Sequence, residues 1–564
     1  MIVSNRHFII VRCFAISTII FCFLLAAPGV RAEGKEGAKE EAAEEAGEKS
    51  GAEGETPLKV LGVKGFGFEL DGYFRSRFYH SEGVPVDISS STQEYTGKLQ
   101  YFDTRLKLAP VIKYADVVKL TVWFHILDDV IWGDNAGISS TGITADTPST
   151  NDRVGDDVGF LSVKAAWLEL NLKLLVMRIG RMPSDFGLGL LTASSDGPGL
   201  EKDFGWNSYS SVYDRILLAT EPVTIILNLA KAKTKRFPLI VAYSYDQLVE
   251  DEIGMGRTRL PYSSEWLGDN TDDVKSHNFA AVYVGDPVKL VTPTDKLIIG
   301  AYFVMRSQEA TFSDLYIVDG YVKLQMGPPN LYGFLEVEAY GIRGQSMAFA
   351  LGEPVTDEDW CREHGHERCP DWLYQNKKAD IASYFIRAGV YWKAHPKIAV
   401  RFKIDTGYAS GDDVITDEHF TGRAMHPDVK VGLVLYGILL HELWRQNWVD
   451  NPGLWTNGGV VNSFFVAEVF KITALDMIDF VFLALQAWPH KVDGVIIEKD
   501  KMLGFEFDLG VRVRLYRDHA HLGLEGGVLM VGDAFNDAAW RNSCTPDMWT
   551  CHIWTLQFWA AYII

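Results

Sequence analysis

The stretch Leu503–Tyr516 has the sequence LGFEFDLGVRVRLY, in which apolar and polar side chains alternate. One face carries Phe505, Phe507, Leu509, Val511, Val513 and Leu515, and the other carries Glu506, Asp508, Arg512 and Arg514. A period of two predicts a β-strand whose faces meet different surroundings. Strands of globular proteins average about five or six residues. A strand about twice that length suits a tilted crossing of a bilayer.

The same alternation recurs from Gly65 to the C-terminus, where Trp554–Ile564 forms the last strand. Short connections such as Tyr114–Asp116 and His395–Pro396 alternate with long ones, which we place at about 81–98, 128–158, 182–210, 249–274, 344–379, 410–461, 489–502 and 533–548. This order predicts an all-β fold: a transmembrane antiparallel β-barrel with short periplasmic turns and long extracellular loops.

The number of strands depends on the segment Val223–Arg236 (VTIILNLAKAKTKR). A strand hairpin there would invert the parity of every later loop, so we interpret it as an irregular periplasmic turn. The barrel then has about 18 strands, an even number as is the rule for bacterial barrels of this kind, with about 16 as the alternative.

Three regions follow from the composition along the chain. Residues 1–32 predict a secretory signal peptide, because a basic start precedes the uncharged stretch Cys13–Ala27 (CFAISTIIFCFLLAA). Residues 33–56 carry nine Glu and three Lys without an aromatic residue, which predicts a disordered, acidic, low-complexity tail. Residues 57–564 form the barrel. The exported chain is expected in the bacterial outer membrane.

Several classes of protein are excluded by composition. A helical membrane protein of 564 residues would be more apolar than this chain, which has 23% charged residues and a mean hydropathy close to zero. The net charge of −20 argues against nucleic acid as a partner. The sequence contains no Gly-x-Ser-x-Gly, His-Glu-x-x-His or phosphate-loop motif, so we predict no enzyme activity and no cofactor.

Two internal stretches carry a family resemblance. Leu175–Leu190 (LVMRIGRMPSDFGLGL) is a strand that enters a glycine-rich loop, and Ile404–Asp413 (IDTGYASGDD) enters an acidic one. With the terminal strands, these stretches resemble the alginate-export-type family of outer-membrane barrels, and more broadly porin-like barrels. The resemblance implies a pore of about 18 strands. It also implies passage of an anionic polysaccharide, as in some members of that family.

Basic side chains recur on the polar face of the strands and are the candidate pore-lining residues: Arg75, Arg77, Arg105, Lys107, Arg178, Arg215, Arg387, Arg401, Lys403, Arg512 and Arg514. Such a lining favours anions. The alternative is that these cations pair with lumen carboxylates, namely Glu69, Asp71, Asp103, Glu169, Asp405, Glu506 and Asp508. The sequence supports the two interpretations about equally.

The predicted function is a porin-like channel for passive passage or export of small or polymeric hydrophilic solutes, with anions favoured. The alternative is a non-conducting structural or adhesin-type barrel that its loops block. Expected partners are outer-membrane lipid and the solute. The sequence does not specify the solute, the direction of transport or the oligomeric state.

The long loops contain three further features. Cys361/Cys369 and Cys544/Cys551 form two close pairs, which predict disulfides in an exported protein. The first pair, with His364 and His366, is also a possible zinc set, but we predict no metal there.

Val431–Trp444 (VGLVLYGILLHELW) is apolar on all sides, and it forms either a helix folded into the barrel mouth or a strand of another register. Asp412, Asp413, Asp417 and Glu418 could hold calcium, but a solvated acidic loop is the favoured interpretation.

Overall fold

A computed structural model describes residues 65–564, apart from several connections. The gaps are 86–95, 116, 134–160, 173, 195–196, 198–201, 206–209, 233–236, 249–273, 286–294, 309–312, 347–376, 414–418, 448–455, 494–495, 499, 517 and 536–551. The predicted signal peptide and the acidic tail lie outside the described residues.

The predicted disulfides also fall in these gaps. Cys361, Cys369, Cys544 and Cys551 all lie outside the described residues, so both disulfides remain predictions. Cys551 directly precedes the last strand, which begins at His552.

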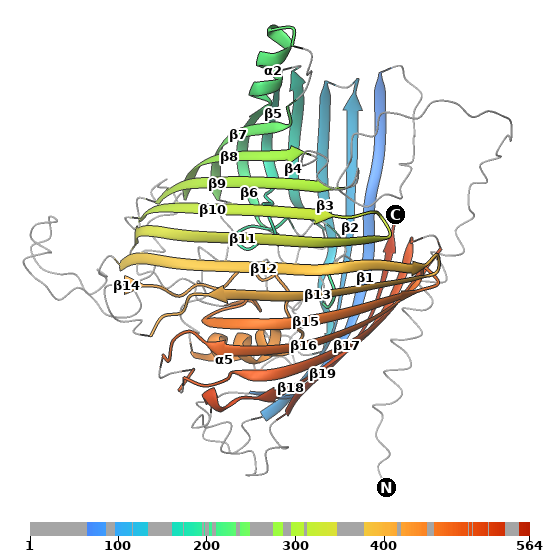
Figure 1. Ribbon diagram of the computed structural model, residues 1–564, viewed down its shortest axis with the longest axis vertical. Helices are drawn as coiled ribbons and strands as arrows, with labels where there is room; N and C mark the ends of the chain where they lie inside the picture. Colours follow the sequence, from blue (N-terminus) through green and yellow to red (C-terminus); the bar gives the residue numbers. More distant parts are fainter. Residues whose placement is uncertain are drawn as a thin grey trace, which may run out of the picture. The chain divides into compact units, whose positions relative to one another are not determined.

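The described strands form one closed antiparallel barrel (Figure 1). Its members are β1 (Phe66–Pro85), β2 (Thr96–Tyr114), β3 (Val118–Gly133), β4 (Leu161–Leu172), β5 (Leu175–Pro183), β6 (Val212–Thr220), β7 (Leu239–Leu248), β8 (Lys275–Gly285), β9 (Lys296–Gln308), β10 (Ser313–Met326), β11 (Leu331–Ser346), β12 (Lys377–His395), β13 (Ile398–Ala409), β15 (Ser463–Ala474), β16 (Ile478–Pro489), β17 (Gly504–Leu515), β18 (Ala520–Val531) and β19 (His552–Ile563).

Each of these strands pairs with the next, and β1 closes the ring by pairing with β19. The sheet has 19 strands in all, but β14 (His419–Phe420) only bridges β12 in parallel. The wall therefore has 18 strands in the described part of the chain. The predicted number of 18 is confirmed, and the alternative of 16 is wrong.

Connections alternate between two ends of the barrel, which we call the turn end and the loop end. The turn end holds short connections such as 475–477, and the loop end holds long ones such as 347–376. Two connections depart from the predicted order. At the loop end, 309–312 spans only four residues between β9 and β10, whereas 286–295 at the turn end spans ten.

The segment that decided the strand number contains a helix. Between β6 and β7, Pro222–Leu229 form α2, with proline in the first turn, where its missing N–H costs no helical hydrogen bond. No strand hairpin interrupts the wall there, so the parity of the later loops holds as predicted.

The outer face of the wall is apolar. Phe482, Phe507 and Leu509 point away from the interior and are 46%, 51% and 50% exposed. None of the described helices is long and apolar enough to cross a membrane. An apolar outer band on a closed barrel places these side chains against lipid.

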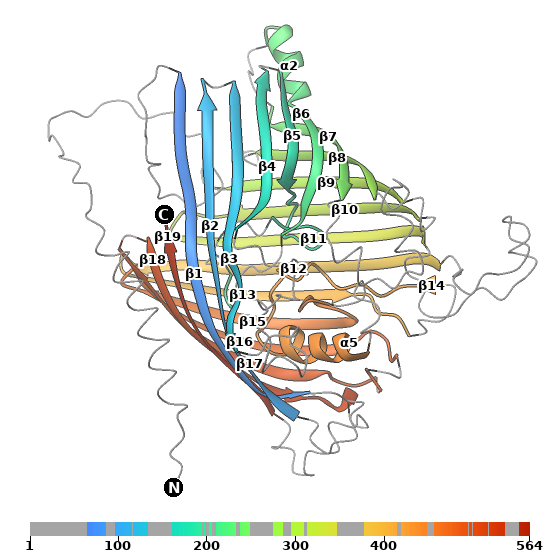
Figure 2. The same ribbon diagram turned by 180° about the vertical axis from the view of Figure 1, so that it is seen from behind.

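The interior differs from a uniformly wet lumen, because inward-folded connections fill its loop half with an apolar core. Val431–Trp444 is buried and contains a π-helix, η2 (Leu435–Leu440), that continues as α5 (His441–Asn447). Figures 1 and 2 show α5 on the inner side of β15 and β16. The wall contributes Ile317, Ile342 and Ile381 to the same core. A helix that is apolar on all sides is stable only when it is buried, so the helical alternative is correct and the strand alternative is wrong.

Candidate functional site

The helical plug, residues 431–447, is fixed to the wall by one buried carboxylate. Glu506 of β17 accepts backbone N–H hydrogen bonds from Leu433, Val434 and Leu435 at 2.6, 2.7 and 2.8 Å. The first N–H groups of a helix lack internal partners, so a fully buried glutamate satisfies them. Gly432 allows this close approach, since a Cβ there would lie 2.6 Å from Oε1 of Glu506.

A second inward connection, residues 184–205 between β5 and β6, is held in the same way. Glu338 of β11 is fully buried and accepts hydrogen bonds from the backbone N–H groups of Leu188 and Leu190. Farther along, Gly205 donates its N–H to Glu525 of β18 at 2.9 Å. The plug belongs to the connection between β13 and β15, which also carries His426. This connection contacts the second one, because the N–H of His426 donates to the carbonyl of Leu190.

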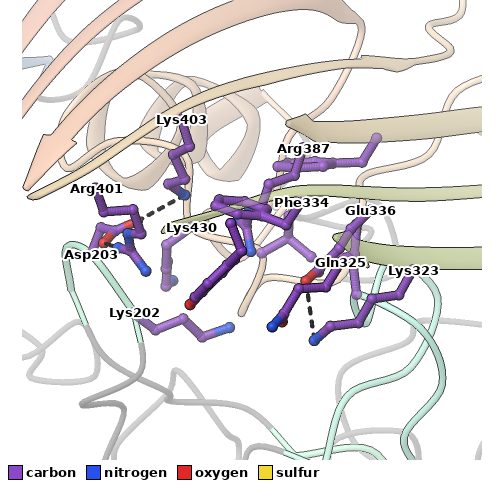
Figure 3. Close-up of a pocket in the computed structure, with 14 residues that line it drawn as sticks. Lys202, Asp203, Lys323, Gln325, Phe334, Glu336, Arg387, Arg401, Lys403 and Lys430 are labelled. Carbon is purple, nitrogen blue, oxygen red and sulfur yellow. Dashed lines mark hydrogen bonds and ion pairs between the residues drawn. The ribbon is translucent and has the colours of Figure 1, made fainter. Parts of the chain in front are cut away.

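Below this core, in the turn half of the barrel, lies a cavity of about 270 Å³ (Figure 3). Four neighbouring strands supply its wall: Lys323 and Gln325 from β10, Tyr332, Phe334 and Glu336 from β11, Phe385 and Arg387 from β12, and Arg401 and Lys403 from β13. The inward connections close it with Leu188, Lys202, Asp203, Val429 and Lys430. The cavity is thus lined by residues of the wall and of both inward connections.

Ion pairs partly neutralise the cations of this cavity. Asp203 binds Arg401 and, at 2.7 Å, Lys403. Asp405 lies 2.6 Å from the Lys403 ammonium and 2.9 Å from Arg387, and Glu336 lies 3.2 Å from Lys323. The residues that line the cavity include six cations and two carboxylates, Asp203 and Glu336. Charged clefts with low-dielectric walls focus the potential of such a lining.

Asp203 is the one acid of the cavity that comes from a connection and not from the wall. Burial alone would raise its pKa, but the nearby Lys403 and Arg401 hold the pKa of Asp203 below its usual range. The carboxylate therefore stays ionised at neutral pH, in contact with two wall cations.

The structure places the sequence-predicted cations on the inner wall, and carboxylates pair with several of them. The pairs are Arg77–Asp103, Arg178–Glu169, Arg215–Asp246, Arg387–Asp405, Arg401–Asp203, Lys403–Asp203, Arg512–Glu525 and Arg514–Asp479. Arg75, Arg105 and Lys107 lie together near the seam, with Arg75 opposite Arg105 and the Lys107 ammonium 3.6 Å from the centre of the Trp123 ring. Only Arg387, Arg401 and Lys403 meet in the cavity.

The alternative interpretation of the lumen cations included Glu506 and Asp508 among their partners, but both carboxylates have other roles here. In the structure Glu506 holds the plug, and Asp508 accepts a 3.1 Å hydrogen bond from the N–H of Leu433. The sequence reasoning also missed Lys202, Asp203 and Lys430, because the connections that carry them have no strand period.

Two of the four suggested calcium ligands have other partners in the structure. Asp412 accepts a hydrogen bond from Thr421, and Asp413 lies 3.3 Å from Lys491. The other two suggested calcium ligands, Asp417 and Glu418, lie outside the described residues. No cluster of potential metal ligands occurs among the residues that the structure describes.

A closed 18-strand antiparallel barrel with an apolar outer face and a charged inner face is a porin-like transmembrane barrel of the bacterial outer membrane. No protein-family model matches the chain, and no curated protein matches it.

Among solved structures, the chain is similar to OccK9 (OpdG) from Pseudomonas aeruginosa, with 8% identity over 88% of this chain and 98% of that one and a TM-score of 0.47. It is also similar to OccAB1 from Acinetobacter baumannii, with 10% identity over 88% and 96% and a TM-score of 0.45. A third similar structure is OccK2 (OpdF) from Pseudomonas aeruginosa in complex with glucuronate, with 10% identity over 90% and 99% and a TM-score of 0.45. These identities and scores are too low to carry an argument about solute or mechanism.

Proposed function

We propose that this barrel is a channel for hydrophilic anions, small or polymeric as in the alginate-export-type barrels it resembles, and that it is not an enzyme. The observation that carries the proposal is the lining of the cavity between β10–β13 and the inward connections, in which six basic side chains outnumber two acidic ones. Rings of basic side chains select anions in pores of this kind.

The position of Asp203 supports a route for the solute. An incoming carboxylate or phosphate can replace the Asp203 carboxylate as the partner of Arg401 and Lys403. Such an exchange conserves the charge-assisted hydrogen bonds of both cations. It also removes one of the contacts that hold the 184–205 connection, beside those with Glu338 and Glu525, so anion binding weakens the docking of that connection.

The second candidate, a barrel that does not conduct, is favoured by a different observation. The apolar core around η2 and α5 occupies the loop half of the interior, and five of the six η2 residues are buried. A permanently docked plug would leave no path for a solute. Single-channel recording in planar bilayers separates the candidates, because a folded barrel without conductance steps supports the second one.

The test of anion preference is the reversal potential under a salt gradient. Lys403→Ala removes a positive charge from the cavity and should lower the anion-to-cation permeability ratio. The matched control is Arg343→Ala, since Arg343 pairs with Asp380 on the outer face and its side chain is 81% exposed. A cation-selective wild type, or an equal ratio for wild type and Lys403→Ala, contradicts the proposal.

A further inference from the structure

The outer face of β13, β15 and β16 carries a carboxylate in its lipid-facing band. Glu468 of β15 is exposed on that face, opposite Ile404 of β13 and Ala484 of β16. The row of outward side chains toward the turn end is Phe402, Phe470 and Phe482. The rows toward the loop end are Thr406, Val466 and Gln486, and then Tyr408, Phe464 and Trp488.

The depth of Glu468 follows from the strand geometry. Aromatic residues such as Tyr408 and Trp488 gather at membrane interfaces. Glu468 lies four residues beyond Phe464 along β15, which is about 13 Å along a strand and about 9 Å in depth at a tilt near 45°. The carboxylate therefore lies below the aromatic row, at the level of hydrocarbon.

A carboxylate at this depth needs a partner. Ionisable groups within a membrane are costly and normally pair with another polar group. Glu468 makes no hydrogen bond or ion pair with any residue that the structure describes. Gln486, on the neighbouring strand and one row away, likewise has no side-chain partner among the described residues.

The outer face at Glu468 is hollowed. A depression of about 790 Å³ lies over β15–β19, and small outward residues, Ala484 and Gly526, contribute to its floor. Small residues at contacts between membrane-spanning segments let two protein backbones approach closely. Phe482 and Phe507 also line the depression and are 46% and 51% exposed. The same outer face therefore has a depression and, at its edge, exposed phenylalanine side chains.

We propose that this face is the interface between two copies of the chain, with Glu468 of each copy accepting a hydrogen bond from Gln486 of the partner subunit. In a pair with two-fold symmetry each contact occurs twice. Gln486 lies one row from Glu468, about 7 Å along a strand, and two long side chains bridge that offset. Lipid acyl chains offer no donor at this depth, whereas the chain itself supplies one beside its own acceptor. This inference rests only on the membrane barrel and is independent of the solute.

The test is the association of the purified full-length protein in detergent and in lipid nanodiscs. Glu468→Leu should raise the dimer dissociation constant about tenfold, because the variant loses two hydrogen bonds between the subunits. The loss of two such bonds between membrane helices weakens association by about that factor. The variant should keep its folded mobility, since leucine suits the lipid-facing band. Glu468→Gln retains an acceptor and should dimerise more tightly than Glu468→Leu.

Cysteine cross-linking gives an independent readout. Ala484→Cys, next to Glu468, should form a disulfide between two copies in the membrane. The control is Val318→Cys on β10, which is 60% exposed on another part of the outer wall and should not cross-link. The proposal is overturned by a wild type that stays monomeric at every concentration, by equal dissociation constants for wild type and Glu468→Leu, or by equal cross-linking of both cysteine variants.

Discussion

Glu506 is expected to keep the channel closed by holding the start of the helical plug. In the structure its carboxylate accepts three backbone N–H hydrogen bonds within the barrel interior. Glu506→Ala removes the acceptor without a change in any other plug contact. The N–H of Leu433 keeps Asp508 as a partner at 3.1 Å, whereas those of Val434 and Leu435 lose theirs.

The magnitude follows from these two donors. A buried donor without a partner costs about 1–3 kcal/mol, and the lower part of that range gives about 2–3 kcal/mol for both. Each 1.4 kcal/mol changes an equilibrium about tenfold, so the undocked population should rise about 30- to 150-fold.

Single-channel recording measures that population directly. Glu506→Ala should open more often or to a larger conductance than the wild type, and Glu506→Gln, which keeps one acceptor oxygen, should be intermediate. The control is Glu169→Ala, because Glu169 is paired with Arg178 on the wall at 2.6 Å and touches neither inward connection. If Glu506→Ala folds and conducts as the wild type does, or if the control opens equally, the plug is not held in this way.

Four further outcomes are expected. Burial lowers the pKa of His426 to about 4, with Lys202, Lys430 and Arg423 adding to the effect and Asp428 opposing it. Because the unfolded imidazole binds its proton near pH 6.5, docking of this segment is strongest above that pH and weakens as the pH falls toward about 4. Openings should increase over this window, and His426→Gln should abolish the increase. Arg105→Ala and Arg178→Ala should each lower the anion-to-cation permeability ratio and leave the fold intact, as reversal potentials and gel mobility will show. The folded protein should resist SDS until heated, and identical migration of heated and unheated samples would contradict a barrel. The mature chain should have no titratable thiol, because Cys361 pairs with Cys369 and Cys544 with Cys551; free thiols with stoichiometric zinc would instead favour a metal site at Cys361 and Cys369.

The wall could be predicted from the sequence because lipid outside and polar surroundings inside impose a period of two on each strand. In β17, phenylalanines and leucine face outward and charged residues face inward, so the alternation alone predicts the strand. The same pattern does not show what each inner residue contacts. Glu506 and Asp103 occupy equivalent inner positions, yet Glu506 binds backbone N–H groups and Asp103 binds Arg77.

The apolar core inside the barrel is reflected in the sequence of the strands that contact it. In β10, Leu315 and Ile317 face inward, and Tyr316 and Val318 face outward, so both faces are apolar near the loop end. Loss of alternation in a strand of a closed barrel indicates that a folded connection covers its inner face. The composition of Val431–Trp444 indicated burial for the same reason. The cavity, by contrast, depends on Asp203 and Lys430, whose positions are set by long-range docking of irregular chain.

Closure of the ring has a consequence for the order in which the protein acquires its structure. The seam joins β1 to β19, and the Ser81 hydroxyl donates to the carbonyl of Trp554 across 473 residues of sequence. Contacts of such sequence separation form late, because the entropy of closing the intervening chain must be overcome before they contribute. Strands β1–β18 therefore present two unpaired edges until the final segment arrives. Edges of this kind invite pairing with other chains, so a growing or truncated polypeptide that lacks 552–563 would be the aggregation-prone species in the biogenesis of this barrel.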